Sequence, residues 1–167
     1  MSGRNIVVIA HDIRSTHNVG SLLRTCEGLG VAHAYFTGYT PYPTLPAGDP
    51  RLPHIAAKLT RQIQKTALGA EALTPWSHQD NVNDCITQLR TEGYTVVALE
   101  QSTGSLHLPD YHSPQKVALL LGREVEGIAP EILAQCDVNL EIPMLGHKES
   151  FNVVQAAAMA LYHLRFM

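Results

Sequence analysis

The sequence predicts an α/β domain in which helices cover a mostly parallel β-sheet. Short apolar, β-rich runs alternate with helical patterns along the chain, as they do where helical crossovers connect parallel strands. A length of 167 residues, with 45% hydrophobic and 16% charged residues, is typical of one ordinary globular domain. Because the chain also lacks internal repeats, low-complexity tracts and linkers, we expect a single domain over residues 1–167.

The first part of the chain predicts a strand, a helix, a second strand and a long loop. Asn5–His11 is an apolar run that ends in polar residues, as a buried parallel strand does. An apolar stripe predicts a helix over Asn18–Leu29, with Asn18 as its N-cap and glycines at its end. Ala32–Phe36 follows as a strand. Thr37–Pro53 holds five prolines and two glycines, which makes it a candidate substrate lid or arm.

The rest of the chain continues the alternation. Pro53 opens a helix that extends to about Ala67, with Lys58, Arg61 and Lys65 on the side opposite its apolar residues. The further elements are predicted, in chain order, at Asp80–Thr91 (helix), Tyr94–Leu99, Lys116–Leu121 and Val138–Ile142 (strands) and Asn152–Phe166 (helix).

The composition excludes several classes of protein. No apolar run is long enough to cross a membrane and residues 1–5 lack the plan of a signal peptide, so we expect a cytoplasmic protein. The cysteines Cys26, Cys85 and Cys136 are far apart, as reduced thiols are, and the histidines form no close pair, so we expect no metal site. With a net charge of −3, a nucleic-acid binder would have to concentrate positive charge locally or share a surface with a second subunit.

Four predicted strand ends lead into polar loops that contain glycine, at residues 12–24, 100–104, 122–127 and 143–152. Ligands bind beyond the carboxyl ends of parallel strands, and glycine lets the backbone approach a ligand closely, so these loops predict a small-molecule pocket. The phosphate-binding pattern GxxxxGK[ST] and the nucleophile elbow GxSxG are both missing. Gly28-Leu-Gly30 ends a helix instead of opening one, which argues against a dinucleotide fingerprint.

Three segments carry a family resemblance. Asn18-Val-Gly-Ser-Leu-Leu-Arg24 resembles the first motif, Asn-x-Gly-x-x-x-Arg, of the TrmH-like (SpoU) branch of the SPOUT methyltransferases. Leu121–Ile128 resembles the second motif, with its Gly-x-Glu-x-x-Gly core, and Ile142–Val153 is similar to the third. The motifs occur in family order and span most of the chain. Phe151 stands where leucine is usual and Val154 where serine is common, and neither change removes a reactive group.

The resemblance implies both a fold and a reaction. It implies a trefoil knot near the C-terminus, S-adenosylmethionine bound within it, and a homodimer. The implied reaction is methyl transfer to a ribose 2′-hydroxyl of a structured RNA, with transfer RNA the first expectation and ribosomal RNA the second. No separate RNA-binding domain is expected, so the dimer would supply the whole RNA surface. The small residues expected at the subunit contact are Gly20, Ser21, Ala156, Ala157, Ala158 and Ala160.

The predicted catalytic residues are Arg24, Asn18, Glu124, Ser150 and Asn152. In the resembling family this arginine is assigned to activation of the hydroxyl, near the substrate phosphate. Because arginine stays protonated, orienting the hydroxyl and holding the phosphate is physically easier than acting as a base. Asn18, Ser150 and Asn152 would also serve as helix caps. Glu124, flanked by glycines, is expected to shape the pocket or a dimer contact.

The resemblance also implies two sets of binding residues. The predicted cofactor contacts, made largely through backbone and apolar groups, are Leu99, Gly122, Ile142, Met144, Gly146, Ser150 and Phe151. The predicted RNA contacts are Arg14, Lys58, Arg61 and Lys65. The last three fall within one narrow arc of a helix, as phosphate neutralisation requires. The same pattern equally fits a solvated helix face.

Three other functions stay open. Methylation of a base nitrogen occurs in other SPOUT branches, but the motif that contains Arg24 disfavours it. An RNA-binding protein without catalysis is disfavoured by the presence of Arg24, Glu124, Ser150 and Asn152, and cofactor turnover would separate it from an enzyme. A nucleotide-dependent oxidoreductase is the third alternative, and a measurement of which cofactor binds would exclude it.

Overall fold

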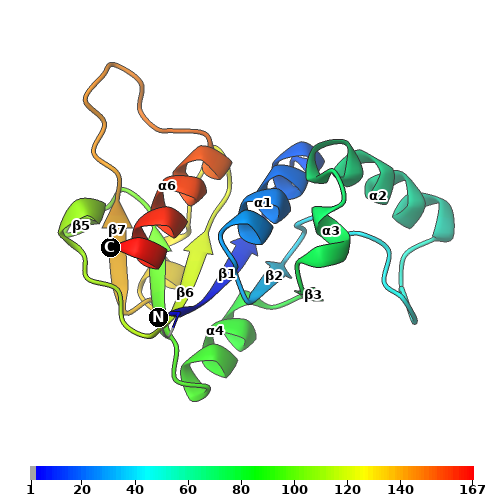
Figure 1. The fold of residues 1–167 in the computed structure, drawn as a ribbon, viewed down its shortest axis with the longest axis horizontal. Helices are drawn as coiled ribbons and strands as arrows, with labels where there is room; N and C mark the ends of the chain where they lie inside the picture. Colours follow the sequence, from blue (N-terminus) through cyan, green and yellow to red (C-terminus); the bar gives the residue numbers. More distant parts are fainter. Residues whose placement is uncertain (1–2) are drawn as a thin grey trace.

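A seven-stranded sheet runs through the protein, and helices cover both of its faces (Figure 1). The computed structural model describes residues 3–167. The strands lie in the order β3-β2-β1-β6-β4-β7-β5, and each neighbouring pair is parallel, which confirms the predicted mostly parallel sheet. The strands are β1 (Asn5–His11), β2 (His33–Thr37), β3 (Trp76–Gln79), β4 (Thr95–Leu99), β5 (Leu106–His107), β6 (Lys116–Leu121) and β7 (Val138–Glu141).

The helices mostly alternate with the strands along the chain. They are α1 (Thr16–Gly28), α2 (Pro53–Ala67), α3 (Ala70–Leu73), α4 (Val82–Thr91), α5 (Pro130–Leu133), α6 (Val153–Phe166) and the 3₁₀ turn η1 (Leu108–Asp110). The exceptions are that α3 follows α2 and β5 follows β4 directly. Within residues 3–167, none of these helices combines the length and the apolar character needed to cross a membrane.

Most predicted elements recur with the expected bounds or close to them. The strands Asn5–His11 and Lys116–Leu121 and the helix Pro53–Ala67 have the predicted bounds. The sequence pattern missed β3, β5, α3 and α5, which have only two to four residues each. An element that short does not complete enough hydrophobic periods to be recognised.

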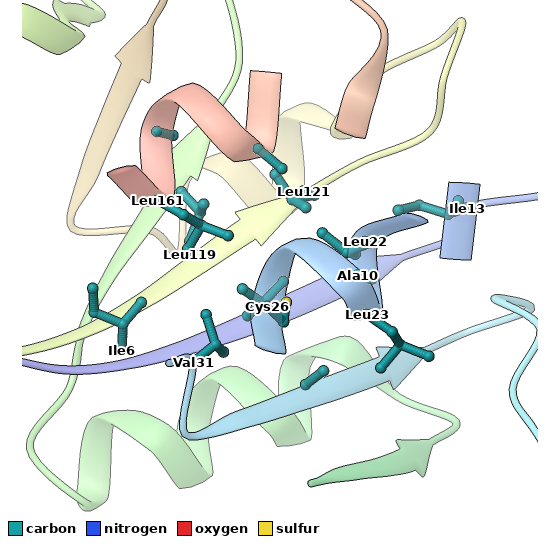
Figure 2. Close-up of a cluster of buried hydrophobic side chains, with 14 of the residues drawn as sticks. Ile6, Ala10, Ile13, Leu22, Leu23, Cys26, Val31, Leu119, Leu121 and Leu161 are labelled. Atoms are coloured by element: carbon teal, nitrogen blue, oxygen red, sulfur yellow. The ribbon is translucent and has the colours of Figure 1, made fainter. Parts of the chain in front are cut away.

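Alternate side chains of the central strands enter two separate cores. In β1, Ile6, Val8 and Ala10 lie on one face of the sheet and Val7 and Ile9 on the other, and all are at most 2% exposed. The first face packs against α1 and α6, as Figure 2 shows, and the second against α4. Burial of a large apolar side chain stabilises the fold by about 1.5–3 kcal/mol. Because alternate side chains of β1 are buried on opposite faces, the strand is held between the helix layers on both sides of the sheet.

The N-terminus of α1 differs from the prediction. The helix begins at Thr16, and its N-cap is Ser15, whose Oγ accepts a hydrogen bond from the backbone N–H of Asn18 at 3.1 Å. The predicted N-cap at Asn18 is therefore wrong. The physical reason is that Ser15 satisfies the first free N–H groups of the helix, which leaves the Asn18 side chain available for other partners.

The expected role of small residues in subunit contact is also wrong for part of the set. Gly20 lies where α1 crosses α2, and a Cβ there would overlap the Ile63 carbonyl oxygen and Thr66 Oγ1. Ala157 and Ala160 are fully buried in the core of their own chain. These positions are small because elements of the same chain approach closely there, so they are not free to contact another chain.

The long loop between β2 and α2 is built around Arg51. Its guanidinium lies 3.7 Å from the centroid of the Tyr42 ring and donates hydrogen bonds to the carbonyl oxygens of Tyr42 at 2.7 Å and Pro43 at 2.9 Å. Arg51 also pairs with Asp49 at 2.6 Å, and this hydrogen bond holds the pKa of Asp49 well below its usual range. The loop that the sequence marks as a candidate lid or arm is therefore fixed by its own arginine.

Candidate active site

A cavity of about 280 Å³ opens at the carboxyl ends of β4, β6 and β7, and we call it the first cavity. Its walls come from the loops that follow these strands and from the start of α6. The predicted cofactor contacts that line it are Leu99, Gly122, Ile142, Met144, Ser150 and Phe151. Gly146 lies exposed in the loop before α6 and does not line it. The structure thus gathers all but one of these residues around one space.

A tight turn after β6 forms one wall of the first cavity. The backbone N–H of Gly127 donates to the Arg123 carbonyl oxygen at 3.1 Å, and the N–H of Arg123 donates back to Gly127 at 3.2 Å. Gly127 has a φ of +69°, in the left-handed region that favours glycine. A Cβ at Gly122 would lie 2.8 Å from the backbone carbon of Gly127. Both glycines of the second motif are therefore required by the path of the backbone.

Glu100 supports this turn, and the sequence prediction missed it. Its Oε2 accepts a hydrogen bond from the backbone N–H of Ile128 at 2.8 Å, and its Oε1 accepts one from Gln101 at 3.1 Å. The carboxylate fits against Gly127, where a Cβ would overlap it. The available signal was an acidic residue directly after a buried strand, in a loop that contains glycine. Glu100 also lines the first cavity, together with Arg123.

Glu124 joins the turn after β6 to the loop after β1. Its carboxylate accepts hydrogen bonds from the backbone N–H groups of Arg14 at 3.3 Å and Ser15 at 3.2 Å, and from Asn18 Nδ2 at 3.3 Å. Burial disfavours the charged form of Glu124, but hydrogen bonds from these groups outweigh it and hold its pKa below the ordinary value. A single carboxylate therefore ties the second motif to the first.

Asn18 extends this connection to the third motif. Asn152 Nδ2 donates to Asn18 Oδ1 at 3.4 Å, while Asn152 Oδ1 accepts from the backbone N–H of Val154 at 2.9 Å as the N-cap of α6. Three of the predicted catalytic residues, Glu124, Asn18 and Asn152, thus form one chain of hydrogen bonds. We call it the Glu124–Asn18–Asn152 chain. It fixes the loops around the first cavity relative to one another.

Other predicted residues have exposed side chains outside this chain, although the backbone N–H of Arg14 donates to Glu124. Arg24 is exposed on α1 and does not line the first cavity. Arg14 is also exposed and pairs loosely with Glu126 at 3.6 Å. The α2 residues predicted to contact RNA are all exposed, at positions Lys58, Arg61 and Lys65. In the part of the chain that the structure describes, no three His, Cys, Asp or Glu side chains lie close enough together to hold a metal ion.

A sequence model described as the SpoU rRNA Methylase family matches residues 51–162. This range contains the second and third motifs, and with them the loops after β6 and β7 that form two walls of the first cavity. The chain belongs to the SpoU family. The resemblance on which the sequence analysis depends is thereby confirmed.

The similarity to individual relatives covers almost the whole chain of this SpoU family member. The mouse tRNA (guanosine(18)-2′-O)-methyltransferase TARBP1 is 33% identical over 159 residues, which are 94% of this chain and 9% of the mouse protein. The tRNA (guanosine(18)-2′-O)-methyltransferase of Aquifex aeolicus is 24% identical over 159 residues, covering 95% of this chain and 68% of the relative. The chain thus spans only a small part of the mouse protein and about two thirds of the bacterial one.

The fold is shared with solved structures. The crystal structure of an AdoMet-bound rRNA methyltransferase from Sinorhizobium meliloti superimposes with a TM-score of 0.80 at 23% identity. The superposition covers 96% of this chain and 55% of the other. At this identity the likeness concerns the fold alone: the parallel sheet and its helices have the same arrangement as in that structure.

The low pKa of Glu124 predicts how stability depends on pH. A carboxylate with a depressed folded-state pKa contributes stability above its unfolded pKa, and the contribution is lost as the pH falls through the folded-state value. Glu124→Gln should therefore lower the free energy of unfolding by about 1 kcal/mol at pH 7, and the difference from wild type should shrink as the pH falls below the ordinary glutamate pKa of 4.5. Urea denaturation across this range measures it. Glu126→Gln, which removes only a loose surface pair, is the control. A pH-independent difference would contradict the role of the Glu124 charge.

Proposed function

We propose that this protein transfers a methyl group from S-adenosylmethionine to a ribose 2′-hydroxyl of a structured RNA, with transfer RNA favoured over ribosomal RNA. The observation that carries the proposal is the Glu124–Asn18–Asn152 chain, which joins all three family motifs around one cavity. The mouse and Aquifex relatives are both named as tRNA 2′-O-methyltransferases, which supports the ribose over a base nitrogen and transfer RNA over ribosomal RNA.

The first cavity has the chemistry that S-adenosylmethionine requires. Leu99, Ile142 and Met144 supply apolar surface for the adenine and ribose, and the glycine turn after β6 exposes backbone to them. Carboxylates also line the cavity, among them Glu141 and Glu149, and they favour a cationic ligand over an anionic one. When bound there, the cofactor supplies the methyl group. The cavity residues hold it and keep its position fixed relative to the loops.

Arg24 acts on the RNA in this proposal. A ribose hydroxyl is a poor nucleophile, and a positioned group has to orient it and stabilise the nearby charge. Arginine stays protonated, so Arg24 would hold the substrate phosphate and orient the hydroxyl instead of removing its proton. Because Arg24 is exposed and lies outside the first cavity of its own chain, a second copy would bring it to the reacting atoms.

We infer that this second copy contacts α6. Met159, Tyr162 and Phe166 are 38%, 58% and 61% exposed and follow one face of the helix, with the Tyr162 and Phe166 rings 4.9 Å apart. An exposed apolar stripe on an otherwise well-packed helix favours a protein contact. The trefoil knot that the resemblance implies is part of the same proposal.

Replacement of Arg24 should separate binding from chemistry. Arg24→Ala should leave the affinity for S-adenosylmethionine nearly unchanged and reduce methyl transfer to transfer RNA by at least about a hundredfold, because the arginine acts on the substrate. Calorimetry measures the affinity and radiolabel transfer measures the rate. Glu27→Ala, an exposed change on the same helix, is the matched control. Near-normal turnover, or loss of cofactor binding, would show that Arg24 has another role.

The dimer makes a second prediction. Tyr162→Glu with Phe166→Glu should shift the mass in light scattering from a dimer to a monomer at micromolar concentration, because carboxylates would be buried at the contact. Leu73→Glu, at an equally exposed apolar residue far along the chain, is the control. A monomeric wild type would exclude the proposed dimer.

Mixed dimers test whether Arg24 serves the partner. Arg24→Ala and Met144→Lys, which places a cation in the first cavity, should each be inactive alone and regain activity when co-expressed, because one mixed-dimer site is then intact. Co-expressed variants that stay inactive, while still forming mixed dimers, would place Arg24 and the cofactor in the same protomer.

The basic residues of α2 make a further prediction. If Lys58, Arg61 and Lys65 neutralise phosphates, their joint replacement by alanine should weaken RNA binding and reduce the slope of log affinity against log salt by about 2–3. Cofactor affinity should not change. Lys116→Ala is the control, since Lys116 begins β6 at the opposite edge of the sheet from the first cavity. An unchanged slope in a folded triple variant would identify this helix face as merely solvated.

A further inference from the structure

A second cavity, of about 360 Å³, opens at the same edge of the sheet as the first one. It lies beyond the carboxyl ends of β1, β2 and β3, whereas the first cavity lies beyond β4, β6 and β7. The residues of its wall that matter here are Arg14, Tyr39, Thr40, Pro41, Tyr42 and Leu59. Neither the motifs nor the cofactor chemistry accounts for this space.

The floor of the second cavity consists of stacked side chains. The Tyr42 ring stacks on His78 with centroids 4.1 Å apart and planes inclined by 19°. The Arg51 guanidinium covers the Tyr42 ring at 3.7 Å. Tyr42 is only 7% exposed, so these groups form the base of the cavity and not its opening. A site of this kind exists before its ligand arrives, which lowers the entropy that binding costs.

Three polar side chains of this floor, those of Thr40, His78 and Arg51, already have partners. Thr40 Oγ1 donates to the Ala10 carbonyl oxygen at 2.9 Å and accepts from the backbone N–H of Ile13 at 3.0 Å. His78 Nε2 and the Gly38 carbonyl oxygen are 3.0 Å apart. Arg51 is engaged by Asp49 and by backbone carbonyls. The floor can therefore contact the face of a flat ring, but these groups have little capacity left to read the ring's edge.

The opening of the cavity, in contrast, offers an aromatic ring and a cation. Tyr39 is 50% exposed, and the Arg14 guanidinium lies 5.9 Å from its ring centroid. The Arg14 side chain is 69% exposed, and its pair with Glu126 at 3.6 Å is loose enough for a phosphate to replace. Tyr39 could thus stack on the flat end of a ligand whose anionic end pairs with Arg14.

Arg14 also connects the two cavities. Its backbone N–H donates to Glu124, the carboxylate that ties the second motif to the first and that lines the first cavity. Its side chain reaches from Glu126, on the turn after β6, to Tyr39 at the second cavity. An RNA strand that crosses Arg14 would therefore have one nucleotide at the first cavity and a neighbouring nucleotide at the second.

We propose that the second cavity binds the base of an unpaired nucleotide close to the methylated one, with Tyr39 stacking on the base and Arg14 binding the intervening phosphate. This inference rests on the proposed methyl transfer to RNA and adds to it the form of the substrate, a single-stranded segment with a splayed base. Single-stranded RNA is commonly read by stacking of this kind. Because the floor has few free polar groups, the site accepts all four bases with similar affinity.

Nucleotide binding tests the site directly. The full chain is saturated with S-adenosylhomocysteine, so that the first cavity is blocked, and titrated with adenosine 5′-monophosphate while binding is followed by NMR. Tyr39→Ala should weaken binding by about fivefold to a hundredfold, and Tyr39→Phe should restore it, since the ring face is kept. Arg14→Gln should weaken binding of the monophosphate but not of adenosine. Leu73→Ala, outside both cavities, is the matched control.

Kinetics with transfer RNA separates this inference from the proposed function. Tyr39→Ala should raise KM for the RNA more than it lowers kcat, with cofactor affinity unchanged. Suppose that the wild type binds cofactor and methylates RNA. The second cavity is then no base site if Tyr39→Ala has the same KM for RNA as the wild type. It is also no base site if the wild type fails to bind the monophosphate at millimolar concentration. If the second cavity strongly preferred the monophosphate of one base, the statement that it accepts all four bases with similar affinity would be wrong. A wild type that neither binds the cofactor nor methylates RNA would refute the proposed function itself.

Discussion

The geometry of the candidate site depends on the hydrogen bonds that the Glu124 carboxylate accepts. This carboxylate accepts hydrogen bonds from the loop after β1, although more than a hundred residues separate the two segments in sequence, and through Asn18 it connects to the start of α6. A neutral side chain could not satisfy two backbone N–H groups and an amide equally well, because hydrogen bonds to a charged acceptor are stronger. The same hydrogen bonds stabilise the charged form of Glu124 and thereby lower its pKa.

The parallel sheet explains why three distant motifs can meet at all. The carboxyl ends of β1, β4, β6 and β7 all lie at one edge of the sheet, so the loops that follow them share a common space. Glycine then sets how closely these loops approach. Gly122 and Gly127 allow the turn after β6 to close against Glu100, and Gly20 lets α2 pack on the helix that carries Arg24.

Periodicity and motif order were sufficient to predict the long elements and most of the wall of the first cavity, because each of these signals is local in sequence. Contacts between motifs were not predictable. Asn18 has the composition of an N-cap, but Ser15 takes that place and Glu124 engages the Asn18 side chain. The small residue Gly20 indicated a close contact, yet sequence alone could not decide whether the partner was α2 or a second subunit. Glu100 was missed for the same reason, since one of its two partners, the backbone N–H of Ile128, follows β6 and lies far from Glu100 in sequence.

The distribution of charge across this edge of the sheet suits the two cavities to the different ligands proposed for them. Carboxylates from Glu100, Glu124, Glu141 and Glu149 surround the first cavity, with Arg123 as a cation among them, so a phosphate is disfavoured there and a cationic cofactor is favoured. Arg14 stands between this acidic region and the aromatic opening of the second cavity. An RNA backbone would therefore be attracted to the boundary, where the uncharged ribose can face the first cavity while its phosphates remain on the cations outside. A net charge of −3 is compatible with RNA binding under this arrangement, because attraction depends on where the cations lie and not on their total.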